Sequence, residues 1–92
     1  MDQEKPCVNH NIICKTVGPE KVLYNPSKDA VHFLNQTAAL IWELSDGRHT
    51  LADMERAIRH KFLVPENADV LGDIKRMLDG FRKQGLLKNA DV

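Results

Sequence analysis

The spacing of apolar residues changes once along this chain, near residue 35, and the change limits the folds open to it. Up to residue 34 the apolar residues form short β-branched clusters separated by turn-forming residues, a pattern typical of strands. From residue 35 onward they recur every three or four positions, as on one face of a helix. We therefore expect a small sheet followed by helices. A length of 92 residues leaves room for one domain.

Three short strands are predicted in the first part, over residues 11–17, 21–24 and 30–34. Gly18-Pro19 marks a turn between the first two strands. A run of turn-forming residues at 25–29 separates the second strand from the third. Two strands joined by about five loop residues suggest a hairpin.

Three helices are predicted in the second part. Asn35 is expected to cap the first helix, which is apolar on most sides. Thr50 and Asp53 resemble a capping box for the second helix, and Pro65 is expected to stop it. Asn67 is expected to cap the third helix. The prediction is an α+β fold similar to a winged helix-turn-helix, with three N-terminal strands and then three helices.

The expected domain covers residues 11–88. Residues 1–10 are polar and contain Pro6, so they are predicted to form a flexible N-terminal tail, and residues 89–92 a C-terminal tail. The longest apolar runs are only a few residues, far short of the roughly 20 needed to span a bilayer. No apolar segment of an export signal follows the N-terminus. The chain is therefore expected in the cytoplasm, without membrane contact, and as a monomer.

Charge and composition exclude several classes of protein. The chain is 42% hydrophobic and 28% charged, and its 13 basic and 13 acidic residues cancel. Such a composition is ordinary for a globular domain and argues against disorder. Nucleic-acid-binding domains normally carry a basic excess, which is missing.

No catalytic or metal-binding motif is evident. Cys7, His10 and Cys14 provide three possible metal ligands without a fourth nearby, whereas zinc sites usually need four. We therefore expect free thiols and neither a metal nor a cofactor. The segment Asp46-Gly47-Arg48 is better explained as a helix stop than as an acid–base site. No phosphate-binding loop or nucleophile elbow occurs, so the chain is not expected to be an enzyme.

Three stretches together resemble the PqqD family. The first runs from Val31 to Gly47 and reads VHFLNQTAALIWELSDG. The second is Thr50 at the start of the next helix. The third is Ala68-Asp69-Val70, which opens the last helix, together with the closing Gly85-Leu86-Leu87. The resemblance covers roughly residues 20–88.

The resemblance implies a non-catalytic peptide chaperone. PqqD-like proteins are precursor-peptide recognition elements, which bind the leader of a ribosomally made precursor and present it to a modifying enzyme. That enzyme is often a radical S-adenosylmethionine protein. The stretches at 22–26 and 29–32 look more like the broad PqqD-like group than its pyrroloquinoline quinone members, and the Cys-containing N-terminus matches no familiar pattern. The pathway therefore stays open between pyrroloquinoline quinone biosynthesis and the modification of another ribosomal peptide.

The resemblance also implies where the leader binds. It would add as a strand beside the third strand, Ala30–Leu34, in a groove shared with the third helix. The candidate residues are Ala30, Val31, His32, Phe33 and Leu34 on the strand and Leu71, Asp73, Lys75, Arg76, Met77 and Gly80 on the helix. The helical wheel places Asp73, Arg76 and Gly80 on one flank of the apolar stripe and Lys75 on the other, with Leu71 at its border. Which flank lines the groove, and which side of the strand faces the core, both remain open.

Two alternatives accompany this hypothesis. The predicted fold overlaps with winged-helix DNA-binding regulators. However, residues 48–92 contain nine basic and seven acidic residues, and acids share the third helix with the bases. The second alternative is an accessory domain that regulates an enzyme without touching a peptide.

Overall fold

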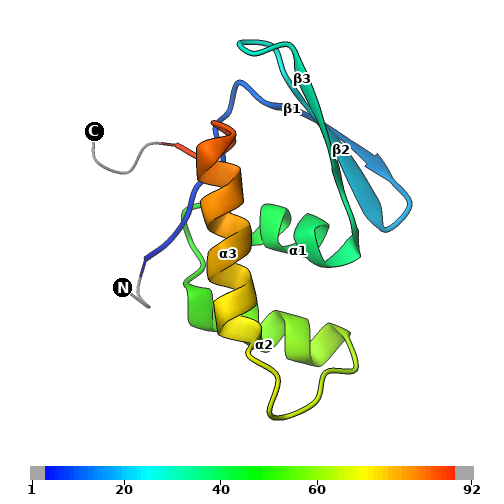
Figure 1. Cartoon of the computed structure of the whole chain (residues 1–92), viewed down its shortest axis with the longest axis vertical. Coiled ribbons are helices and arrows are strands. Elements are labelled where there is room, and N and C mark those ends of the chain that lie inside the picture. The colour runs from blue at the N-terminus through cyan, green and yellow to red at the C-terminus, as the bar shows by residue number, and fades with distance from the viewer. Residues whose placement is uncertain (1–3, 89–92) are drawn as a thin grey trace.

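The structure, a computed structural model, describes residues 4–88. A three-stranded sheet is followed along the chain by three helices (Figure 1). The elements are β1 (Ile13–Val17), β2 (Glu20–Asn25), β3 (Ala30–Leu34), α1 (Gln36–Leu44), α2 (Leu51–Lys61) and α3 (Val70–Lys83). The predicted α+β class is confirmed, and the winged-helix description is compatible with this order.

The sheet is an antiparallel meander in the order β1-β2-β3. Its middle strand alternates strictly: Lys21, Leu23 and Asn25 are buried, whereas Val22 and Tyr24 are only partly covered. Because successive side chains point to opposite faces, one side of β2 and β3 faces the helices and the other faces outward, whereas all five residues of β1 are exposed. The predicted strands are confirmed, and β3 has the predicted ends.

Polar side chains define the start of each helix. The Asn35 side chain accepts a hydrogen bond from the backbone N–H of Ala38, and the Thr50–Asp53 capping box is complete, as predicted. The predicted cap of α3 was wrong, because Asp69, not Asn67, accepts a hydrogen bond from the backbone N–H of Gly72. A short backbone turn, from the Ala68 N–H to the Pro65 carbonyl, precedes this cap and delays the helix.

The second helix also ends earlier than expected. It stops at Lys61, because Phe62 adopts an extended backbone. Pro65 therefore does not terminate α2 but lies within the loop that leads to α3. This loop contributes apolar side chains to the candidate site.

The hydrophobic core lies where the three helices meet the inner face of the sheet. Its fully buried side chains are Leu23, Ile41, Met54, Ile74, Leu78 and Leu86. Trp42 of α1 meets Phe81 of α3 edge to face, with ring centroids 5.8 Å apart. Within residues 4–88, no helix has the length and apolar character needed to cross a membrane.

The N-terminal segment packs on the helical end of the molecule. Cys7 forms a β-bridge with Asp46, and Val8 forms one with Leu87. The Val8 N–H donates to the Ser45 carbonyl at 2.8 Å. Residues 6–9 are thus held against the domain, whereas the sequence predicted a loose tail over residues 1–10. Residues 1–3 and the predicted tail at 89–92 lie outside the described residues.

Candidate functional site

Strand β3 forms an edge of the sheet. It pairs with β2 from Ala30 opposite Asn25 to Leu34 opposite Lys21. Among residues 4–88 no strand pairs with its other side. Edge strands offer unpaired N–H and C=O groups, and an extended peptide can pair with them whatever its side chains.

The structure decides which side chains of β3 face the core. Leu34 is buried, and Ala30 and His32 on the same side are half-buried. Val31 and Phe33 point outward and are 52% and 80% exposed. The candidate strand residues therefore divide into an inner set next to the helices and an outer set on the open face of the sheet.

One atom of the inner set has no hydrogen-bond partner. The Nε2 atom of His32 is buried, and it is the one such orphaned side-chain atom found within the described part of the chain. A buried polar atom without a partner costs about 1–3 kcal/mol. This cost falls on the strand where a peptide is expected to bind.

Helix α3 is linked to the sheet through β2, the strand that pairs with β3. At its C-terminal end, the side-chain amide of Asn25 donates to the Gln84 carbonyl at 3.3 Å. At its N-terminal half, Val70, Asp73 and Met77 line a cavity together with Thr37, which follows the end of β3. The cavity is thus connected to β3 through Thr37, three residues after the strand ends.

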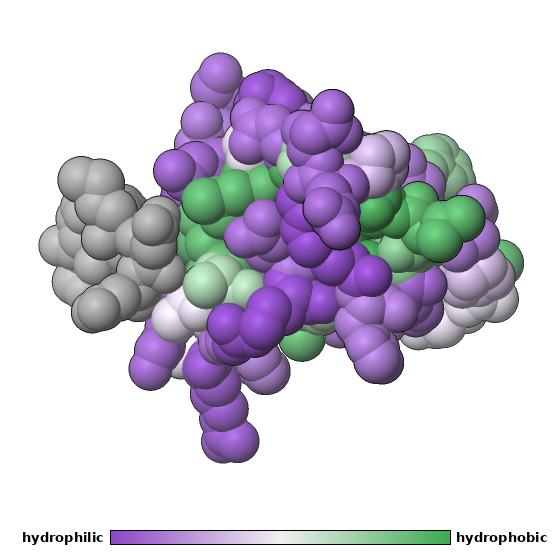
Figure 2. Space-filling view, turned by 90° about the horizontal axis from the view of Figure 1, so that it is seen from below, coloured by the Kyte–Doolittle hydropathy of each residue, from purple (hydrophilic) through white to green (hydrophobic). Residues whose placement is uncertain are grey.

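This cavity, hereafter the α3 cavity, has a volume of about 550 Å³ and is mainly apolar. It opens between α1, α2, α3 and the α2–α3 loop. Its lining residues are Thr37, Ile58, Phe62, Val64, Ala68, Val70, Asp73, Arg76 and Met77. In the view of Figure 2, patches of apolar surface show between hydrophilic side chains. A cavity of this size accommodates one or two large apolar side chains of a ligand.

Three of the predicted helix residues, Asp73, Arg76 and Met77, come together at this cavity. Asp73 and Arg76 form an exposed ion pair, which places both signs of charge beside an apolar hollow. Gly80 follows Met77 by about one turn on the same flank. A Cβ at Gly80 would meet no heavy atom within 4 Å, so space is open there.

The other two helix residues lie elsewhere. Lys75 lines a separate hollow on the opposite flank, with Leu51 of α2 and Glu4 of the N-terminal segment. Leu71 is half-buried, packs against the core and does not line the α3 cavity. The helical wheel did not show which flank of α3 lines a groove. In the structure, the flank with Asp73 and Arg76 borders the α3 cavity, and the flank with Lys75 borders the other hollow.

Several lining residues were not predicted from the sequence. Phe62, Val64 and Ala68 come from the α2 end and the loop after it. Their apolar character in a connecting segment was the available signal, since exposed loops are usually polar. Nothing in the sequence around Thr37 indicated that it lines a cavity.

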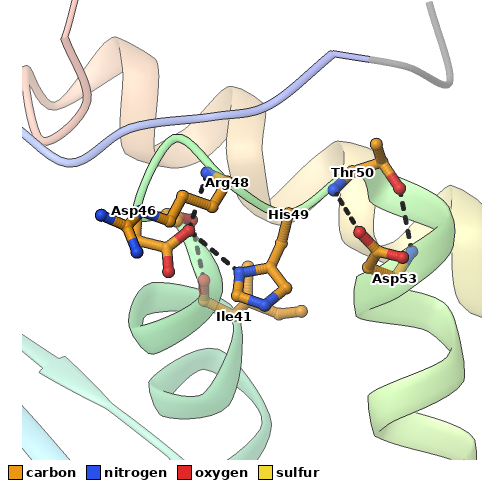
Figure 3. A network of polar contacts seen from close by, with 7 residues as sticks. Ile41, Asp46, Arg48, His49, Thr50 and Asp53 are labelled. Carbon is orange, nitrogen blue, oxygen red and sulfur yellow. Dashed lines mark hydrogen bonds and ion pairs between the residues drawn. The ribbon is translucent and has the colours of Figure 1, made fainter.

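The polar cluster between α1 and α2 is structural (Figure 3). The Asp46 carboxylate accepts a hydrogen bond from the Arg48 N–H at 2.9 Å and contacts His49 Nδ1 at 2.9 Å. The hydrogen bond from His49, followed by that from Arg48, lowers the pKa of Asp46. These partners all lie within three residues, so the cluster shapes the turn that ends α1.

The two cysteines lie in different segments, and both are free thiols. Cys14 is an exposed free thiol on β1, and Cys7 is a half-buried free thiol beside Gly47. No group of three or more metal-ligating side chains is found within residues 4–88. The Cys7–His10–Cys14 spacing therefore leads to no metal cluster there.

Comparison with known proteins gives a family and a fold. Residues 20–87 match the family model described as Coenzyme PQQ synthesis protein D (PqqD). No curated protein matches the chain significantly.

Two solved structures have a similar fold. One, "TbiB1 in Complex with the TbiA(beta) Leader Peptide", is 18% identical with a TM-score of 0.79, covering 90% of this chain and 95% of that one. The other, "Lasso peptide synthetase B1 complexed with the leader peptide", is 24% identical with a TM-score of 0.77, covering 92% of this chain and 99% of that one. Both proteins were solved with a leader peptide.

Proposed function

This chain belongs to the PqqD family, and we propose that it binds the leader of a ribosomally made precursor peptide and presents that leader to a modifying enzyme. The leader adds as a fourth strand beside β3 and places an apolar side chain in the α3 cavity. The chain itself contributes no catalytic group. The modifying enzyme is a radical S-adenosylmethionine protein or another peptide-modifying enzyme, and the complex acts in the cytoplasm.

The observation that carries this proposal is the free edge of β3, followed in the chain by Thr37 at the rim of an apolar cavity on α3. The edge supplies hydrogen bonds that do not depend on sequence, and the cavity supplies selectivity. Two proteins of the same fold were solved with leader peptides, which supports the same class of ligand here.

The energies fit a reversible carrier. About four backbone hydrogen bonds contribute about 1 kcal/mol each. Burying one or two apolar side chains adds roughly 1.5–3 kcal/mol apiece. Association and ordering of the peptide oppose these gains by several kcal/mol. The remainder corresponds to an affinity no tighter than about micromolar, which allows the leader to be handed on.

A matched pair of charge reversals on α3 tests the site. Arg76 lines the α3 cavity, and Lys75, its neighbour in sequence, lies on the opposite flank. We expect Arg76→Glu to weaken leader affinity about tenfold, or ~1.4 kcal/mol, because it removes the guanidinium donors and places a second acid beside Asp73. Lys75→Glu should leave the affinity unchanged.

The measurement is isothermal titration calorimetry with a synthetic leader of the precursor encoded beside this gene. Circular-dichroism melts of both variants control for folding. Equal affinities for Arg76→Glu, Lys75→Glu and the native chain would remove the charged flank from the site. No binding by the native chain would refute the proposed function itself.

A further inference from the structure

The outward face of the sheet is unusually apolar. We name it the outer sheet face; it consists of Ile13, Lys15, Val17, Glu20, Val22, Tyr24, Val31 and Phe33. The strand register places Ile13, Tyr24 and Val31 in one row across the three strands. The next row contains Lys15, Val22 and Phe33. All three positions of the first row, and two of the three in the second row, are thus apolar or aromatic.

These side chains are exposed to solvent. Val31 and Phe33 have already been described, and on β1 Ile13 and Val17 are 54% and 59% exposed. They make up four of the five large hydrophobic residues that are exposed within residues 4–88; the fifth is Leu63. An antiparallel sheet with one face on the core normally carries polar residues on the other face. A contiguous apolar patch instead marks an interaction site.

The composition of the face is that of a protein interface. Tyr24 and Phe33 are aromatic, a residue class enriched in interface centres. Charged groups lie around and between the apolar ones: Lys15 and Glu20 on the strands, and Asp29, which accepts a hydrogen bond from the Tyr24 hydroxyl at 2.8 Å. A hollow of about 390 Å³, lined in part by Val17, Val22 and Phe33, lies at one end of the face.

The size of the face indicates what covers it. Three strands about 4.8 Å apart and five residues long at about 3.3 Å each span roughly 14 × 17 Å. That is a flat footprint on the order of 240 Å², small beside the faces of stable interfaces, which remove about 800 Å² of accessible surface from each partner. Two copies packed face to face would therefore hold together weakly. A stable partner must extend beyond this face onto the surface next to it.

The adjoining surface is the free edge of β3. A leader bound there extends the same sheet by one strand and places alternate side chains beside Val31 and Phe33. The outer sheet face and the bound leader then form one wider surface. A protein that covers both contacts the chaperone and its cargo together.

We propose that the outer sheet face, widened by the bound leader, is the docking surface for the modifying enzyme, which meets it with an apolar surface of its own. This inference rests on the proposed function. It implies that the enzyme binds the leader-loaded chain more tightly than the empty chain.

The test uses substitutions on β1, the strand farthest from β3. The double variant Ile13→Thr/Val17→Thr removes two exposed apolar side chains and keeps β-branched residues, which favour the strand. The control Leu63→Thr removes an exposed apolar side chain from the α2–α3 loop. The probe is the purified peptide-modifying enzyme encoded in the same gene cluster, titrated with each full chain, with and without leader peptide.

We expect the double variant to bind the enzyme about tenfold more weakly, or ~1.4 kcal/mol, at unchanged leader affinity, and Leu63→Thr to bind it like the native chain. Unchanged enzyme affinity of the double variant would overturn the proposal. Sedimentation of the native chain as a dimer that the double variant abolishes would also overturn it, in favour of a second copy. If the leader fails to bind the native chain, the proposed function is refuted. The docking proposal is then still tested by comparing the enzyme affinities of the native chain and the double variant without leader.

Discussion

Short polar side chains fix where each helix of this small domain begins. Asp53 accepts the backbone N–H of Thr50 at 2.9 Å, and the Thr50 hydroxyl accepts the N–H of Asp53 at 3.1 Å. The hydrogen bond from the Thr50 N–H is the main reason why the pKa of Asp53 lies below its ordinary value. A carboxylate at the start of a helix also interacts favourably with the helix dipole.

The capping box predicts a pH dependence of stability. Because the pKa of Asp53 is lower in the folded chain than in the unfolded one, its stabilising contribution is present above the ordinary value of 3.8 and is lost as the pH falls through the folded pKa. We expect Asp53→Asn to flatten the acid limb of the stability curve. Urea unfolding at several pH values between about 6 and 2.5 measures this slope.

The control is Glu66→Gln, which removes an exposed carboxyl from the α2–α3 loop and should leave the acid limb as steep as in the native chain. Parallel curves for the native chain and Asp53→Asn would contradict the assigned role of Asp53.

At the scale of elements, the strand β3 and the caps of α1 and α2 were predictable from local sequence. Turn residues bracket Ala30–Leu34, and Asn35 and Thr50 are strong capping residues. The cap of α3 was not predictable in this way, because Asn67 and Asp69 are both good capping residues and local sequence did not reveal the turn from Pro65 to Ala68 that delays the helix. The helical wheel gave the correct relative positions of Arg76 and Lys75 but not their surroundings, since packing between elements decides which flank borders the α3 cavity.

Gly80 on α3 allows one variant to test both helix stability and the proposed binding site. Glycine inside a helix costs about 1 kcal/mol relative to alanine, and a Cβ at this position meets open space. We expect Gly80→Ala to raise the free energy of unfolding by about 0.5–1 kcal/mol and to weaken leader affinity, because the added methyl narrows the approach of the leader backbone. Urea unfolding and calorimetry on the same preparation measure both effects.

The control variant is Lys83→Ala, at the last residue of the same helix. It should not affect leader affinity. A stabilised Gly80→Ala variant with native leader affinity would show that the leader does not pass close to Gly80.

At the scale of the whole molecule, contacts between distant segments complete the fold. The bridges from Cys7 to Asp46 and from Val8 to Leu87 join the N-terminal segment to the helices. Nothing in the local composition of residues 1–10 indicates these partners, because each lies more than 35 residues away. For the same reason the α3 cavity, built from three helices and a loop, could be predicted only in part.

The distribution of charge on the molecule favours peptide binding over DNA binding. On α3, Arg76 pairs with Asp73, and Arg82 contacts Asp79 at 3.5 Å and also pairs with Glu4. A recognition helix normally directs several unopposed basic or amide side chains at a groove. The acids on α3 would repel phosphates, and the comparisons lend the DNA-binding alternative no support.

The central claim is that a leader peptide binds along β3 and the neighbouring flank of α3. The most direct test is a two-dimensional NMR titration of the isotope-labelled chain with the synthetic leader. The account predicts shifts concentrated on Ala30–Leu34 and on the flank of α3 that carries Asp73, Met77 and Gly80. An absence of shifts at high peptide concentration, with salt-sensitive shifts on α3 from duplex DNA, would contradict it.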